Sequence, residues 1–121
     1  MATHNAGRAL VGLGLLALPL TAPAADLGAT IAKQGNGKGA TACQTCHGAD
    51  GSGNAAAGFP RLAGMNADYL AKQLRDLQGD GRDNATMNPI ASALTAKEIE
   101  AVAAYYSGMT PSAKAPGAGD A

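Results

Sequence analysis

Two long segments of the chain repeat their apolar positions at the spacing of an α-helix. In the first, residues 66–78, leucines recur at i, i+4 and i+7 and so share one face: Leu70, Leu74 and Leu77. Asn66 is a favourable N-cap in front of them, and Gly79 is a common helix stop behind them. The pattern predicts a helix over 66–78.

The second segment, residues 95–108, begins with Thr95 and Glu98, which have the spacing of a capping box. Apolar side chains then recur at i, i+3, i+4 and i+7: Ile99, Val102, Ala103 and Tyr106. Gly108 follows as a stop. The pattern predicts a second long helix.

Shorter patterns occur in the sequence before and between these two predicted helices. An apolar side over residues 27–34 predicts a short helix, and residues 40–46 predict a further helical turn. Residues 48–58 and 79–90 are rich in glycine and turn residues and are predicted to be irregular. Because no segment has a convincing strand pattern, we expect an all-α fold with one domain.

The start of the chain has the order of a secretory signal. Arg8 precedes the apolar run ALVGLGLLALPL over residues 9–20, and Ala22-Pro23-Ala24 follows as an A-x-A cleavage site. A membrane anchor or buried helix is the alternative, and the prolines in this region argue against it. We expect residues 1–24 to be a cleaved signal peptide, 25–110 a folded domain and 111–121 a flexible tail.

The most specific signal is Cys43-Gln44-Thr45-Cys46-His47, a C-x-x-C-H sequence. Two thiols at this spacing can form thioethers with the two vinyl groups of one haem, and the adjacent histidine then supplies the proximal iron ligand. The motif predicts one covalently attached haem c, held by Cys43, Cys46 and His47.

Three other interpretations of the cysteine pair are weaker. A structural zinc site needs about four ligands, and the only other histidine, His4, lies in the predicted signal peptide. A thioredoxin-type pair follows a hydrophobic strand, whereas glycines precede Cys43. A disulfide across two intervening residues would remove little chain entropy.

Composition agrees with a haem protein and excludes other classes. Nine basic and nine acidic residues balance in the full chain, so no basic surplus indicates nucleic-acid binding. After the first apolar run, no second run is long enough to cross a membrane. The chain has no Trp, one Phe and three Tyr, so a haem would supply the aromatic mass that a small core lacks.

Two further residues are candidates for the haem site. Pro60 offers a carbonyl that could accept a hydrogen bond from His47 Nδ1 and so fix the imidazole. Met87 is an apolar, oxidisable residue in a polar segment, and iron ligation would explain its presence there.

The chain resembles class I cytochromes c, and within them the bacterial cytochrome c4/c553 type. Five stretches carry the resemblance: ACQTCHGADG (42–51), FPRLAG (59–64), NADYLAKQLRDL (66–77), MNPIASALT (87–95) and EIEAVAAYYSG (98–108). The resemblance implies thioethers at Cys43 and Cys46, His47 as proximal ligand and Met87 as distal ligand. It also implies that the Pro60 carbonyl faces His47, and that the first and last helices cross beside the haem.

Two departures from the family pattern matter. Cytochrome c4 proteins have two such domains and this chain has one. Met65 stands where many relatives have Gln, which adds a rival iron ligand, and Met109 is a third methionine. We favour Met87, because Met65 lies too close after the proximal segment and Met109 lies beyond the last helix.

A closed pair of axial ligands implies electron transfer rather than catalysis. We expect an exported, periplasmic one-electron carrier of a Gram-negative bacterium, which meets a redox donor and acceptor transiently and has no membrane span once mature. Two alternatives remain open. The chain could be the cytochrome subunit of a larger oxidoreductase, such as a flavocytochrome, or a haem enzyme or gas sensor with an open distal site.

Overall fold

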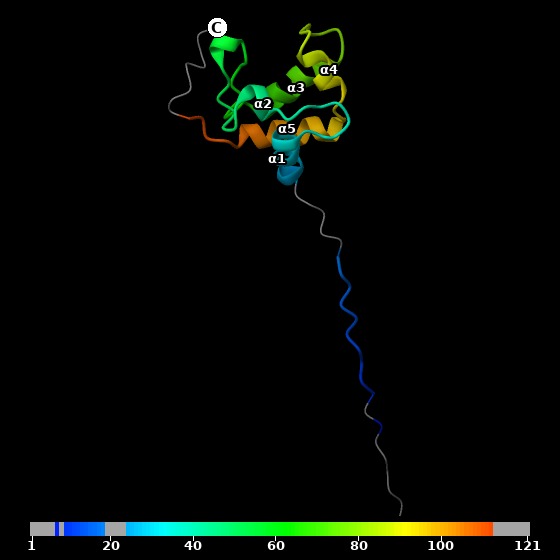
Figure 1. The fold of residues 1–121 in the computed structure, drawn as a ribbon. Coiled ribbons are helices and arrows are strands. Elements are labelled where there is room, and N and C mark those ends of the chain that lie inside the picture. Colours follow the sequence, from blue (N-terminus) through cyan, green and yellow to red (C-terminus); the bar gives the residue numbers. More distant parts are fainter. Residues whose placement is uncertain (1–6, 8, 19–23, 113–121) are drawn as a thin grey trace, which may run out of the picture.

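The computed structural model describes residues 7, 9–18 and 24–112. Within them the chain forms five α-helices and one short 3-10 helix, η1 (Figure 1). Their bounds are α1 (Ala24–Gln34), α2 (Gln44–His47), η1 (Ala55–Ala57), α3 (Ala67–Gln78), α4 (Met87–Ser92) and α5 (Ala96–Ser107). The predicted all-α fold is confirmed: the described residues contain no strand, only an isolated bridge between Asn54 and Phe59.

The first and last helices, α1 and α5, pack across each other (Figure 1). Gly28 makes this possible, because a Cβ atom there would lie 2.3 Å from the carbonyl oxygen of Ala101. Ile31 from α1 and Ile99 from α5 are both 1% exposed beside this crossing. The crossing that the family resemblance implied is therefore present.

The two long predicted helices correspond to α3 and α5. Asn66 caps α3, its Oδ1 accepting a hydrogen bond from Tyr69 N at 3.0 Å. Thr95 and Glu98 form the predicted capping box at the start of α5. Both α3 and α4 pack beside this framework, α3 against α5 and α4 against α3.

The prediction that residues 79–90 are irregular is wrong for the last part of this segment. Met87 begins α4, a helix of six residues. Asn88-Pro89 indicated a turn, but Pro89 lies in the first turn of α4, where a missing N–H costs no intrahelical hydrogen bond. Asn84 Oδ1 accepts hydrogen bonds from Thr86 N at 3.1 Å and Met87 N at 2.8 Å, which fixes the start of the helix.

The apolar run before α1 takes no part in the core. Its described part, residues 9–18, extends away from the helices, and Leu10 is 98% exposed there (Figure 1). Ala22 and Pro23 of the expected cleavage motif lie outside the described residues, as do residues 113–121 of the expected tail. Among the described residues, no helix is both long and apolar enough to cross a membrane.

Candidate haem site

The cysteine pair stands at the start of the short helix α2. Cys43 immediately precedes α2 and Cys46 lies within it, and both are half-buried free thiols. The helical turn is closed by a hydrogen bond from His47 N to Cys43 O at 3.0 Å. Burial raises the pKa of the Cys43 thiol above its ordinary value. The turn brings the three residues of the motif onto the wall of one cavity.

His47 is a polar residue that is nevertheless buried, at 6% exposure. Its Nδ1 lies 2.8 Å from the carbonyl oxygen of Pro60, the partner expected from the sequence. The carbonyl can only accept, so Nδ1–H donates and Nε2 keeps its lone pair. This arrangement orients the ring and makes Nε2 the nitrogen available to a metal.

The loop between His47 and Pro60 is itself held by backbone hydrogen bonds. Gly53 N donates to His47 O at 2.8 Å, and Leu62 N donates to Gly51 O at 2.8 Å. These contacts fold residues 48–62 back on α2, which is why a carbonyl thirteen positions away in sequence reaches the imidazole. The small residues of this segment therefore belong to an ordered loop rather than to a plain linker.

A cavity of about 370 Å³ lies in front of His47. Aromatic and aliphatic side chains form most of its wall, including Phe59, Leu62, Leu70, Leu74, Ile90, Val102 and Tyr106. A volume and lining of this kind suit a large apolar ligand. Tyr106 is 3% exposed and packs edge-to-face on Tyr105, with the ring centroids 5.1 Å apart, so the two tyrosines pack against each other.

The three candidate methionines, Met65, Met87 and Met109, differ in their relation to this cavity. Met87 and Met65 line it, whereas Met109 packs against the core cluster and does not line it. The sulfur of Met65 already accepts a hydrogen bond from Arg61 Nη2 at 3.5 Å. No hydrogen bond to the Met87 sulfur is present among the described residues.

The described residues contain no group of three or more His, Cys, Asp or Glu side chains placed to hold a metal ion. The zinc interpretation of the cysteine pair therefore finds no ligand set in this part of the chain.

Comparison with known proteins gives the family. A family model described as cytochrome c oxidase, cbb3-type, subunit III matches residues 25–105. The chain belongs to this cytochrome c family. Its cofactor is covalently bound haem c, and Cys43 and Cys46 fit the attachment motif.

The relatives agree with the resemblance predicted from the motifs. A thiosulfate dehydrogenase electron acceptor of Stutzerimonas stutzeri is 49% identical over 100 residues, covering 83% of this chain and 46% of the relative. Cytochrome c-554(548) of Halomonas halodenitrificans is 44% identical over 68 residues, covering 54% of this chain and 81% of the relative.

A solved structure extends the likeness to the fold. Reduced recombinant cytochrome c4 from Pseudomonas stutzeri aligns with a TM-score of 0.67 at 38% identity, covering 72% of this chain and 48% of that chain. The chain thus spans slightly less than half of this cytochrome c4, and also of the first curated relative.

One polar side chain that the sequence did not single out supports the fit of a haem. Arg61 lines the cavity, and its Nε is buried with no hydrogen-bond partner among the described residues. The guanidinium makes one hydrogen bond there, to the weak sulfur acceptor of Met65. A half-buried cation short of acceptors beside an apolar cavity suits a ligand that carries carboxylates, as haem does.

Proposed function

We propose that the chain is an exported one-electron carrier whose haem iron is held by His47 and Met87. The observation that carries this proposal is the shared cavity: the two attachment cysteines, the oriented imidazole of His47 and Met87 all line it. Cys43 and Cys46 form the thioethers, and the Pro60 carbonyl fixes the proximal imidazole.

The chemistry follows from this ligand set. Haem iron with both axial positions filled passes single electrons and presents no open position to a substrate. A thioether ligand favours the reduced iron, which raises the reduction potential relative to two imidazoles. The protein is therefore a carrier and not an enzyme.

The partners are redox proteins that donate and accept electrons in short-lived contacts. The relative named as a thiosulfate dehydrogenase electron acceptor supports a role in receiving electrons from another protein. The balanced charge of the chain gives no strong electrostatic steering, so small and transient interfaces suit it.

A second candidate function is suggested by the name of the same relative. That protein is named as the electron acceptor of a thiosulfate dehydrogenase, which favours a role for this chain beside a larger redox enzyme. In that case the chain is the cytochrome component of an oxidoreductase complex. Co-purification of a second redox protein at fixed stoichiometry would favour the complex, and a free monomer would favour the carrier.

Export to the periplasm is part of the proposal. The exposed apolar run over residues 9–18 supports a leader that the fold does not need. The haem-loaded protein should begin at Ala25 or Asp26 when its amino terminus is sequenced. An intact Met1 on that protein would indicate an anchor instead.

The absorption spectrum in both redox states tests the ligand set. A low-spin ferric spectrum with a weak near-infrared sulfur-to-iron band, and no carbon monoxide binding by the reduced protein at neutral pH, is the expected result. Rapid carbon monoxide binding would support a haem enzyme or gas sensor with an open distal site.

A further inference from the structure

Two asparagine side chains hold the start of α4, and we call Asn84 and Asn88 the asparagine clamp. Asn84 Oδ1 accepts from the backbone N–H of Met87 at 2.8 Å. Asn88 Oδ1 accepts from Asn84 N at 2.8 Å, and Asn88 N donates to Asn84 O at 2.8 Å. Met87 therefore lies between two residues that bond to each other in both directions.

The amide nitrogen of Asn88 ties this loop to the end of α3. Asn88 Nδ2 donates to Leu77 O at 2.7 Å and to Arg82 O at 3.1 Å. The carbonyl of Leu77 belongs to the last turn of α3, where carbonyls lack intrahelical partners. Since both acceptors are carbonyls, a donor is required at this position, and the orientation of the Asn88 amide is unambiguous.

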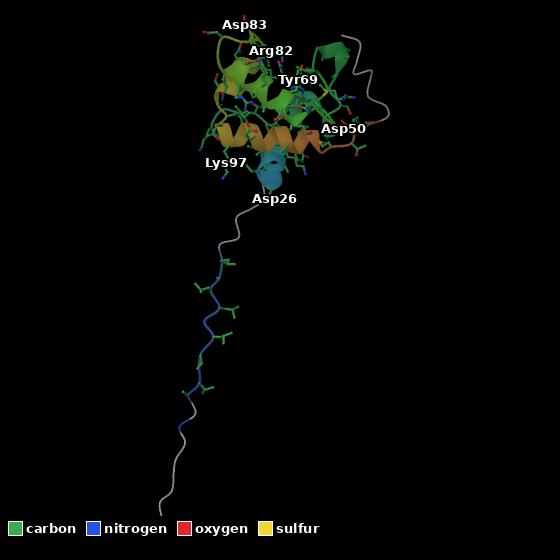
Figure 2. The ribbon with its side chains drawn as sticks, turned by 180° about the vertical axis from the view of Figure 1, so that it is seen from behind. Asp26, Asp50, Tyr69, Arg82, Asp83 and Lys97 are labelled. Atoms are coloured by element: carbon green, nitrogen blue, oxygen red, sulfur yellow. The ribbon has the colours of Figure 1, made fainter. Side chains whose placement is uncertain are left out.

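The end of α3 also holds the carboxyl end of α4. Gln78, the last residue of α3, donates through Nε2 to Ala91 O and Leu94 O, both at 2.8 Å. The whole of α4 is thus anchored to the carboxyl end of α3. Figure 2 shows Arg82 on the loop that follows α3, at the top of the molecule and away from Asp50 near the attachment segment.

We propose that the asparagine clamp positions Met87 for iron and sets how readily an external ligand displaces it. The inference rests on the proposed function, because it takes Met87 as the distal ligand. Asn88 does not line the cavity, and it acts through the backbone of its neighbour. Opening the clamp frees the Met87 segment to move away from the cavity, and a competing ligand binds only in that open state.

Imidazole binding to the ferric holoprotein measures this opening. Asn88→Ala removes the donor to two carbonyls and the acceptor for Asn84 N, so the open state becomes more populated. Loss of hydrogen bonds of this kind should raise the apparent imidazole affinity roughly tenfold or more. Asn88→Asp keeps an acceptor but turns a carboxylate toward two carbonyls, and should raise the affinity at least as much.

Asn66→Ala is the matched control. Asn66 also accepts a backbone hydrogen bond at a helix start, at 3.0 Å, but it caps the opposite end of α3 and does not line the cavity. This variant should melt at a lower temperature and leave the imidazole affinity at the wild-type value. If Asn88→Ala and Asn66→Ala both lower the melting temperature with unchanged imidazole affinity, the clamp is a purely structural feature and the proposal is wrong.

Asn84→Ala serves where Asn88 variants yield too little holoprotein. Asn84 is exposed and also lines the cavity, so Asn88→Ala, at a residue outside the lining, stays the decisive variant. Removal of the Asn84 side chain costs the Met87 and Thr86 hydrogen bonds while leaving those of Asn88 Nδ2. Its imidazole affinity should rise by a smaller factor in the same direction, and an unchanged affinity would overturn the proposal.

Met87→Ala separates failure of the clamp from failure of the ligand assignment. If this variant keeps the sulfur-to-iron band, Met87 is not the ligand and the proposed function fails. If it loses the band while Asn88→Ala and Asn84→Ala bind imidazole like the wild type, the ligand assignment stands and the clamp proposal fails.

Discussion

The His47 side and the Met87 side of the cavity are built in different ways. His47 is 6% exposed, belongs to the attachment motif and meets the Pro60 carbonyl thirteen positions later. Met87 is only half-buried, and its position depends on the side chains of Asn84 and Asn88, the second of which donates to the Leu77 carbonyl at the end of α3. Figure 1 shows α2 and α4 as separate elements on either side of α3.

The two sides therefore differ in how readily an iron ligand on each side could be exchanged. In the proposed site, covalent attachment at Cys43 and Cys46 would keep the iron next to His47 even when the surrounding structure loosens. Met87 would have no such covalent link, so its retention would depend on hydrogen bonds that break and re-form. Ligand exchange and changes of spin state are therefore expected on the Met87 side.

The largest expected effect comes from removing the covalent bonds on the His47 side. Cys43→Ala combined with Cys46→Ala should abolish covalent haem and leave a poorly folded chain, because the cofactor fills the centre of a small core. Acid-acetone extraction measures the attachment. The wild-type protein should keep its haem in the pellet, and complete extraction from it would contradict the attachment assignment.

Met87→Ala should have the next largest effect, and this effect should be confined to the Met87 side of the cavity. The iron should gain high-spin character, its potential should fall, and the reduced protein should bind carbon monoxide, while haem attachment stays complete. Absorption spectroscopy and a redox titration measure these changes. Met65→Leu and Met109→Leu are the controls, and loss of the sulfur-to-iron band in Met65→Leu alone would move the assignment to Met65.

A substitution at the α1–α5 crossing should destabilise the whole fold, and with it both the His47 side and the Met87 side of the cavity. Gly28→Ala would place a Cβ atom 2.3 Å from Ala101 O and 2.8 Å from Tyr105 Cβ. Overpacking of this kind should cost about 2–3 kcal/mol in the free energy of unfolding, measured by denaturant titration. Gly79→Ala, whose Cβ would meet nothing within 4 Å, should stay within about 0.5 kcal/mol of the wild type.

The smallest effect concerns a link between the two sides. Asn36, in the loop before the cysteines, donates through Nδ2 to Ala93 O at 2.8 Å and Glu98 Oε2 at 3.1 Å. The hydrogen bond from the backbone of Thr95, with a smaller contribution from Asn36, lowers the pKa of Glu98. A lowered pKa stabilises the fold above the unfolded value of about 4.3, and this stabilisation disappears as the pH falls through the folded value.

Glu98→Gln tests that link. The difference in melting temperature between the wild type and the variant should be largest near neutral pH and should shrink below about pH 4. A difference that stays constant across this range would mean that the Glu98 charge contributes nothing to stability.

The sequence was most informative where the structure is local. The attachment motif, the Asn66 cap and the capping box at Thr95 each depend on residues a few positions apart, and the fold contains all of them. The close approach of Pro60 to His47 was expected from the residues and strengthened by the family resemblance.

The Met87 side was harder to predict because it depends on contacts between distant residues. Asn88-Pro89 has the composition of a turn, yet it lies in α4, because hydrogen bonds to Leu77 and Arg82 outweigh the local preference. Asn88 donates a hydrogen bond to the last turn of a helix eleven positions earlier, and a contact of this kind leaves no periodic pattern in the sequence. Arg61 was missed for the same reason, since the burial of its Nε atom follows only from the folded loop.

The crossing of α1 and α5 also decides the order in which the domain can assemble. These helices are the first and last elements of the described fold, so their contact closes a loop that contains the attachment motif, α3 and α4. Closing so long a loop carries a large entropic cost and slows folding relative to local helix formation. A growing chain lacks the main partner of α1 until α5 has been made, so the packing of α1 is completed only at the end of folding.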